Sequence, residues 1–318
     1  MRLSILIPVF DAADYLRELL TSVRAIPIAA TDLEVIVIDD GSRDHSADVV
    51  KAFAMQDVRI KFLQQANCGV AETRNRLLQA ATGKYVWFVD ADDVLVPEVV
   101  PLLMEMTTND VDIITFNGVR FGTGLEEQAI YAAHKEPQNM TGEAWVCKLL
   151  NQRELRHFAW LHWCRRAYLA DIALVFRSGI LHEDVAWVSE VALRAASVIY
   201  IDKAAYRYRQ NENSATGSRD DVRVLHRIRS YFTVVNQLRE LNERVRMLPA
   251  TRRLLRGEIV GQAMQVFELK RTLASENNRR AISIECRTRK FAQSLWNEAV
   301  GYKRKRQVLS MIVRQWLD

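Results

Sequence analysis

The sequence of 318 residues has no run of about 18 or more uncharged apolar residues, so it offers no candidate transmembrane helix. Its first residues lead directly into an apolar segment, without the charged start, apolar stretch and cleavage site of a signal peptide. The G-x-x-x-x-G-K-[ST] loop of P-loop enzymes is also missing. These absences predict a cytoplasmic protein that is not a P-loop NTPase.

Cysteine is scarce. The four residues, Cys68, Cys147, Cys164 and Cys286, lie far apart, and no CxxC pair occurs. This spacing argues against a zinc site or a disulfide framework and favours reduced thiols in the cytosol. For Cys68, a small residue that fits its loop is a simpler interpretation than a reactive thiol.

The net charge of +5 conceals an asymmetry along the chain. Residues 1–218 hold 22 Lys and Arg against 29 Asp and Glu, whereas residues 219–318 hold 22 against 10. A basic segment favours an anionic neighbour such as a membrane surface, a nucleic acid or an acidic glycan. A solvated face, or docking on the acidic half, remains an alternative.

The first hundred residues alternate between apolar runs typical of buried strands and segments with helical periodicity. This alternation of strands and helices predicts a mostly parallel, doubly wound α/β sheet. The expected strands cover 3–9, 34–38, 60–63 and 85–89, and the expected helices cover 14–25, 44–54, 70–81 and a segment from Pro97.

The remaining chain is predicted to change character near residue 218. Before that point we expect strand-like structure over 111–131, helices over 141–150 and 183–196, and short strands over 197–201 and 204–208. After residue 220 the sequence is Arg-rich and helical. The predicted domains are therefore 1–218, with halves 1–100 and 101–218, and a basic helical region over 219–318.

Clusters of carboxylates follow two of the predicted parallel strands, and a single polar residue follows a third. Asp39 and Asp40 end the second strand, Asp90 and Asp92 end the fourth, and the first ends at Asp11. The carboxyl ends of parallel strands share one edge, where α/β proteins bind ligands. Such carboxylates can accept hydrogen bonds from a nucleobase or ribose. The Asp90 and Asp92 pair suits Mg²⁺ or Mn²⁺ bridging phosphates.

Several short motifs together resemble a family 2 glycosyltransferase of the GT-A fold, densely over 1–100 and more thinly over 101–218. The matching segments are Ile7-Pro-Val-Phe10, Val37-Ile-Asp-Asp-Gly-Ser42, Asn67-Cys-Gly69 with Arg74-Asn75, and Val89-Asp-Ala-Asp-Asp93. The resemblance implies a nucleotide-sugar donor, usually a UDP-sugar.

The resemblance also assigns donor-site roles. Asp40 would bind uracil with Asp39 close by, Asp90 would face the ribose or sugar, and Asp92 would ligate Mn²⁺ or Mg²⁺. The remaining donor-site residues that it implies are Pro8, Phe10, Asn67, Gly69 and Arg74. The chain departs from the family at Asp11, where Asn is usual, and at Glu72-Thr73, where small residues are commoner, so the donor sugar stays open.

Leu181-His-Glu-Asp-Val185 opens a predicted helix, and acids are favoured in a first helical turn by the helix dipole alone. The family draws its general base from a Glu-Asp pair in this region. The resemblance therefore implies Asp184 as the base and Glu183 as an acceptor-binding residue. For His182, an ordinary loop histidine and an acceptor contact are both open.

Two further segments carry less specific patterns. In Tyr206–Thr216, Arg207, Arg209 or Ser214 could contact the donor pyrophosphate, or the arginines could lie solvated on an edge strand. In 296–318, basic residues beside tryptophans suit an amphipathic helix on anionic lipid. A helix that caps the catalytic domain, or a homo-oligomer contact, is the alternative, and little supports a nucleic-acid partner.

The combined hypothesis is a metal-dependent, inverting transferase that moves a sugar to a glycan or lipid-linked glycan. The family resemblance places it in bacterial surface polysaccharide or lipopolysaccharide synthesis, on the inner face of the cytoplasmic membrane. The rivals are a nucleotidyltransferase that uses the same metal carboxylates, and a non-catalytic binding module.

Overall fold

The computed structural model describes residues 1–132, 139–210 and 220–316. The chain divides into two compact units, each built from separated segments. The sheet unit comprises Met1–Trp145, Phe158–Gly179 and Arg194–Asn211, and the helical unit comprises Val146–His157, Ile180–Leu193 and Glu212–Asp318. The predicted boundary at residue 218 lies outside the described residues.

The sheet unit contains one mixed sheet with nine strands among the described residues, in the order β3-β2-β1-β4-β8-β6-β9-β5, with β7 paired to β6. Strands β1 to β4 are parallel neighbours, and β6 is parallel to β9, whereas β8, β5 and β7 pair antiparallel. The predicted α/β sheet is confirmed. The strand bounds are β1 Leu3–Val9, β2 Leu33–Asp39, β3 Ile60–Gln64, β4 Tyr85–Phe88, β5 Val94–Leu95, β6 Ile113–Phe121, β7 Gln128–Ala129, β8 His162–Arg165 and β9 Val198–Arg209.

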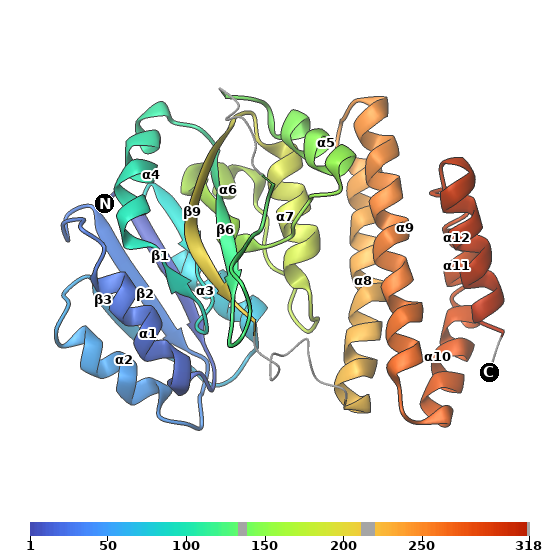
Figure 1. Ribbon diagram of the computed structural model, residues 1–318, viewed down its shortest axis with the longest axis horizontal. Helices are drawn as coiled ribbons and strands as arrows, with labels where there is room; N and C mark the ends of the chain where they lie inside the picture. The colour runs from blue at the N-terminus through green and yellow to red at the C-terminus, as the bar shows by residue number, and fades with distance from the viewer. Residues whose placement is uncertain (133–138, 211–219, 317–318) are drawn as a thin grey trace. The chain divides into compact units, whose positions relative to one another are not determined.

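Helices cover both faces of the first four strands (Figure 1). The helices α1 and α2 lie on one face and α3 lies on the other, because the chain returns across β2 and β1 between β3 and β4. All seven residues of β2 are buried, which explains the apolar run Val35–Ile38 before Asp39. The helix bounds in this unit are α1 Ala13–Arg24, α2 Ser46–Ala54, α3 Val70–Ala80, α4 Val100–Met106 and α6 Arg166–Ile172.

The two short strands predicted over 197–201 and 204–208 are a single strand, β9. The polar pair Asp202-Lys203 lies between the two predicted segments. The pairing of β9 with β6 shifts register around Asn117, and the strand continues through this irregularity. The Asp202 carboxylate accepts hydrogen bonds from Asn117 Nδ2 at 2.9 Å and from the Tyr200 hydroxyl at 2.8 Å, which stabilise it inside the sheet.

The helical unit is built around the long helices α8 and α9, which pack side by side (Figure 1). Apolar residues of α7, α8, α9, α10 and α12 share one buried cluster. Within the described residues, no helix combines the length and apolar character needed to cross a membrane. The helix α5, Gly142–Gln152, contributes residues to both units. The bounds of the other helices in this unit are α7 Glu183–Arg194, α8 Asp221–Arg244, α9 Pro249–Thr272, α10 Glu276–Thr288, α11 Phe291–Ser294 and α12 Gly301–Arg314.

Candidate active site

The ends of β1, β2 and β4 lie next to one another in the sheet unit. The parallel register pairs Val9 with Asp39, and β4 lies on the other side of β1. The sheet therefore gathers the acidic turns after β2 and β4 at one edge, on either side of the turn after β1, as the sequence predicted. Phe10, in that turn, is 45% exposed, and Pro8 is half-buried.

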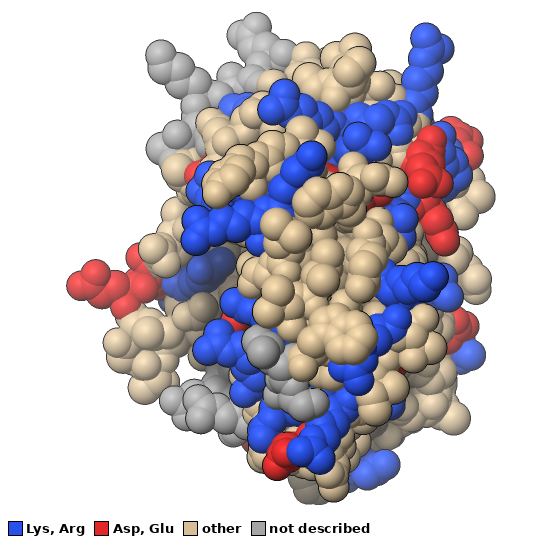
Figure 2. Space-filling view, turned by 90° about the vertical axis from the view of Figure 1, so that its right-hand side faces the viewer, with Lys and Arg blue, Asp and Glu red and all other residues tan. Residues whose placement is uncertain are grey.

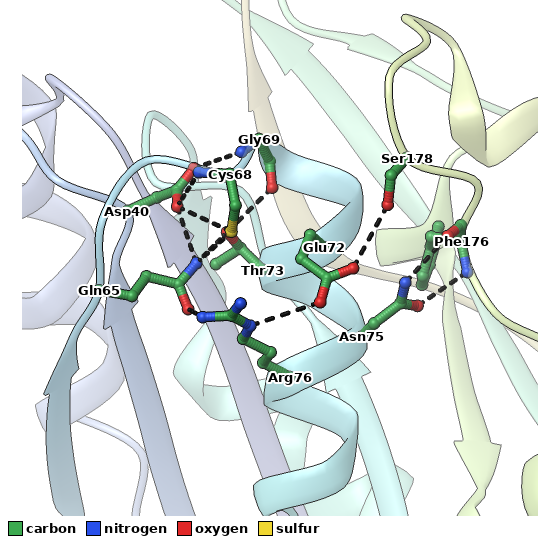
Figure 3. Close-up of polar contacts among 10 residues, drawn as sticks. All are labelled: Asp40, Gln65, Cys68, Gly69, Glu72, Thr73, Asn75, Arg76, Phe176 and Ser178. Carbon is green, nitrogen blue, oxygen red and sulfur yellow. Dashed lines mark hydrogen bonds and ion pairs between the residues drawn. The ribbon is translucent and has the colours of Figure 1, made fainter.

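The Asp40 carboxylate organises the loop that leads into α3 (Figure 3). It is buried, and it accepts hydrogen bonds from Gln65 Nε2 at 2.7 Å, from the Cys68 N–H at 2.9 Å and from the Gly69 N–H at 2.8 Å. Burial by itself would raise the pKa of Asp40, but these hydrogen bonds outweigh it and lower the pKa below the usual value. Asp40 is therefore a fixed negative charge that holds residues 65–69 in place through these hydrogen bonds.

The turn after Asp40 requires glycine. Gly41 has a φ of +76°, and a Cβ there would meet the Asn67 backbone nitrogen at 3.0 Å. Asp39 is also buried, and its Oδ1 accepts from the Ser42 N–H at 3.2 Å. Asn67 and Gly69 are exposed beside this turn. The structure thus brings together predicted donor residues from the turn after β2 and from the loop that leads into α3.

Cys68 does not have the character of a reactive thiol. Burial, followed by the hydrogen bond and the charge of Asp40, raises its pKa, so the thiol stays protonated at neutral pH. This agrees with the interpretation of Cys68 as a small residue that fits its loop.

Helix α3 links this loop to the carboxylates after β4. Arg74 is buried, and its Nη2 contacts Asp90 Oδ1 at 2.8 Å while the guanidinium lies over the Phe176 ring. The adjacent Asn75 donates to the Phe176 carbonyl at 2.9 Å and accepts from the Phe176 N–H at 2.8 Å (Figure 3). Both residues of the Arg-Asn pair are therefore anchored, which argues against an ordinary pair on a helix surface.

Two residues to which the sequence motifs assigned no role complete the turn after β4. The Tyr206 hydroxyl donates to Asp93 Oδ2 at 2.6 Å and accepts from the Asp90 N–H at 3.0 Å. Asp93 is fully buried, and burial, together with the charges of Asp92 and Asp90, raises its pKa well above the usual value. The signal that the sequence offered for Tyr206 was the Tyr/Arg segment of β9.

Arg209 is held by several contacts within the sheet unit. Its N–H donates to Asp93 Oδ1 at 2.7 Å, and its Nε donates to the Asp92 carbonyl at 2.8 Å. Its Nη2 pairs with Glu18. In this arrangement Arg209 ties the end of β9 to the acidic turn. Ser214, the other pyrophosphate candidate, lies outside the described residues.

The turn after β4 has the chemistry of a partial metal site. The described residues contain no group of three or more His, Cys, Asp or Glu side chains arranged to hold an ion. Mg²⁺ is commonly bound by one or two carboxylates together with substrate phosphates. Asp90 and the half-buried Asp92 fit that pattern. The raised pKa of Asp93 reflects burial first and then the negative charge beside it, which a divalent cation would offset.

The predicted catalytic pair lies in the helical unit. Glu183 and Asp184 begin α7, where Glu183 is buried and Asp184 is partly exposed. His182 precedes them with a φ of +61°, and its ring lies 4.7 Å from the Tyr231 ring. Burial, followed by the nearby charge of Arg227, lowers the pKa of His182 to about 4. His182 is therefore neutral at physiological pH.

The sequence model described as Glycosyl transferase family 2 matches residues 4–164. This match covers half of the chain and includes both acidic turns. The chain belongs to glycosyl transferase family 2. It is thus an enzyme of the glycosyltransferase class, as the motifs indicated.

Proteins with similar sequences are also named glycosyltransferases. The chain is 32% identical over 246 residues to the uncharacterized glycosyltransferase YibD of Escherichia coli K12, covering 76% of this chain and 71% of YibD. It is 29% identical over 226 residues to the glycosyltransferase GlyA of Streptococcus pneumoniae, covering 67% of this chain and 31% of GlyA.

Solved structures support the GT-A fold. Residues 1–349 of Staphylococcus aureus TarS, in complex with UDP-GlcNAc, superpose with a TM-score of 0.57 at 18% identity, covering 91% of this chain and 92% of the other. The mannosyltransferase PcManGT of Pyrobaculum calidifontis, in complex with GDP-Man and Mn²⁺, gives 0.58 at 13% identity, covering 99% and 87%. At these identities the likeness establishes the fold alone.

Proposed function

We propose that this enzyme is a metal-dependent, inverting glycosyltransferase that uses a UDP-sugar and a glycan or lipid-linked glycan acceptor. The main support is the set of carboxylates at adjoining strand ends, with Asp39 and Asp40 after β2 and Asp90 and Asp92 after β4. Nucleotide ligands bind at this edge in open α/β sheets. Solved relatives of the same fold were studied with UDP-GlcNAc and with GDP-Man and Mn²⁺, which supports a nucleotide-sugar donor.

In the proposed donor site, Asp39 and Asp40 lie at the uracil end, and the partly exposed Phe10 and Pro8 border the base. Arg74 holds Asp90 in place through its ion pair. Asp90 and Asp92 would hold Mn²⁺ or Mg²⁺, which when bound would supply charge stabilisation to the departing diphosphate. Arg209, in addition to its predicted pyrophosphate contact, keeps the Asp92 backbone in position.

In the proposed transfer, Asp184 removes the proton from the acceptor hydroxyl, and Glu183 helps to bind the acceptor. A single displacement at the anomeric carbon then inverts its configuration. Both acids lie at the start of α7, a part of the helical unit that also contributes to its apolar core. That packing gives the two carboxylates a rigid support.

We further propose that the enzyme works in the bacterial cytoplasm on surface polysaccharide or lipopolysaccharide, at the inner face of the membrane. In α12, Val308 and Met311 are buried in the helical unit, which supports the interpretation of the tail as a packed helix. Leu309, Val313 and Trp316 remain exposed on the same segment. Together with the basic residues of α12, they offer a surface for anionic lipid.

Donor binding is tested by thermal shift against UDP-, GDP-, CMP- and dTDP-sugars, with and without Mn²⁺. A ligand that binds only the folded state raises the melting temperature by mass action. We expect a metal-dependent shift with one UDP-sugar. The absence of any shift from folded protein would favour a non-catalytic module, and release of pyrophosphate in place of UDP would show nucleotidyl transfer.

The base is tested with Asp184→Asn. We expect transfer to fall on the order of 10²- to 10⁴-fold, because a general base is lost, while the donor-induced thermal shift persists. Asp48→Asn, on the exposed surface of α2, is the matched control. Turnover by Asp184→Asn at the rate of the control would remove Asp184 from the mechanism.

A further inference from the structure

A positively charged pocket of about 660 Å³ lies within the helical unit, and none of its lining residues is among the donor-site and catalytic residues assigned above. It is formed by the segment that follows α5, the first half of α9 and the start of α12. Five cationic side chains line it: Arg153, Arg156, Arg253, Lys303 and Arg304. Figure 2 shows the side of the molecule formed by α10 to α12, where Lys and Arg are widespread and acids are few.

The positive charge of this pocket is only partly offset within the protein, by the nearby charge of Glu258 and by a hydrogen bond from Arg304 Nη1 to Gln307 Oε1 at 3.0 Å. Among the described residues, no ion pair joins any of the five cations to a carboxylate. Glu258 is the one acid among the lining residues, and its Oε1 accepts a hydrogen bond from Gln262 Nε2 at 2.7 Å. Like charges that converge without partners repel one another, so this arrangement favours an anionic ligand.

Two of the lining residues also have a buried atom with unused hydrogen-bonding capacity. Nε of Arg156 and Nε2 of His157 are buried, and neither has a partner among the described residues. Buried polar atoms are normally satisfied, and exceptions call for an explanation such as a ligand. Both atoms belong to the segment that lines the pocket.

The side chain of Arg304 packs beside two glycines of α9. A Cβ on Gly257 would lie 3.5 Å from Arg304 Nε, and one on Gly261 would lie 3.9 Å from Nη1. These are ordinary van der Waals separations, so the guanidinium lies directly against this face of the helix. Burial lowers the pKa of Arg304, the charge of Glu258 opposes this, and Arg153 adds to the lowering.

The chemistry of the lining identifies a class of ligand. Four of the five cations are arginines, whose planar forks match phosphate oxygens in pairs. The amide side chains of Gln262 and Gln307 also line the pocket. Gln262 Nε2 donates to Glu258 and Gln307 Oε1 accepts from Arg304, which leaves Oε1 of Gln262 and Nε2 of Gln307 for hydroxyl groups. We propose that this pocket binds the phosphate or diphosphate group of a phosphorylated glycan. Identifying that glycan with the acceptor rests on the proposed function, whereas the anion site itself does not.

The test is calorimetric titration of the full-length protein with inorganic pyrophosphate, glucose 1-phosphate, glucuronate and glucose. Arg156→Gln combined with Arg304→Gln should weaken pyrophosphate binding at least about 10-fold, because charge-assisted hydrogen bonds are lost. The matched control combines Arg271→Gln with Arg280→Gln, which removes the same charge from exposed ion pairs outside the pocket. Arg153→Gln with Arg253→Gln, both exposed, repeats the test without disturbing buried groups.

We expect the unchanged protein to bind glucose 1-phosphate but not glucose. We also expect the control variant to keep the affinity of the unchanged protein for pyrophosphate. Equal losses in the pocket and control variants would overturn the site, because they would reflect net charge alone. Glucuronate binding as tightly as glucose 1-phosphate would overturn the phosphate assignment. UDP-sugar hydrolysis, measured on the same variants, should be unchanged, so failure of the pocket and failure of the proposed function are distinguishable.

A lipid source of the phosphate is separated by flotation with vesicles of phosphatidylglycerol or phosphatidylcholine. We expect the pocket variants to float with phosphatidylglycerol as well as the control does. Selective loss of flotation in the pocket variants, combined with no binding of glucose 1-phosphate, would assign the pocket to a lipid headgroup and overturn the glycan.

Discussion

The carboxylates at the strand ends of the sheet unit have partners within the protein, whereas the cations that line the pocket of the helical unit have no carboxylate partner in the part of the chain that the structure describes. In the sheet unit, Asp40 is bonded by four donors and Asp90 is paired with Arg74. In the helical unit, the arginines around the pocket have no ion-pair partner among the described residues. The acids are thus positioned before any ligand arrives, whereas the cations depend on a ligand to offset their repulsion.

This difference separates two ways to build a binding site. Internal hydrogen bonds hold a charged group in place before the ligand binds, so no further free energy is needed to position it. This preorganised arrangement favours catalysis. A cluster of unpaired cations instead attracts an anion over a distance and gains stability when it binds. The three predictions that follow test this contrast, in order of decreasing effect.

The largest effect is expected from Asp92→Ala. Loss of a metal ligand should reduce transfer by roughly 10³-fold or more, while the circular dichroism spectrum and melting temperature stay near those of the unchanged enzyme. The assay is release of UDP from the sugar that the thermal-shift screen identifies, with Asp48→Ala as the surface control. Wild-type turnover by Asp92→Ala would contradict the metal site.

A smaller effect is expected on stability from Glu34→Gln in β2. Glu34 is buried and accepts from Ser4 Oγ at 2.6 Å, from Lys61 Nζ at 2.6 Å and from the Thr82 N–H at 2.7 Å. Burial would raise the pKa of Glu34, but these partners outweigh it and hold the pKa at about 2 instead of 4.5. We expect a loss on the order of 2 kcal/mol at pH 7.

The pH dependence of that loss follows from the depressed pKa. The contribution of Glu34 is fully present above its unfolded value of 4.5 and disappears as the pH falls towards about 2. Urea unfolding of both proteins between pH 7 and pH 2 should therefore give curves that converge on acidification. A difference that stays constant over this range would show that the charge of Glu34 is not the cause.

The smallest effect is expected from Arg253→Gln in the pocket of the helical unit. Because this exposed cation has no ion-pair partner among the described residues, its loss should change the free energy of unfolding by no more than about 0.5 kcal/mol. Any change should be a gain at low salt that shrinks as salt is added. Destabilisation comparable to that of Glu34→Gln would remove the contrast between the two units.

Local patterns in the sequence were enough to predict most of the sheet unit. The apolar runs before Asp39 and Asp90 are strands because both of their faces are buried, and the acids that follow lie at one edge because the strands are parallel. The single strand β9 was not predicted, because an irregular pairing with β6 accommodates Asp202 and only the partner strand reveals it.

The sequence by itself determined the fold class, the family and the positions of the acidic turns, because these depend on periodicity and short motifs. Only the tertiary structure decided that Tyr206 joins Asp93 to Asp90, and that the cations around Arg304 converge on one pocket. The Tyr206 contacts span 113 and 116 positions, and the pocket cations come from three separate segments of the chain. Such distant pairing is set by packing and leaves no local pattern in the sequence.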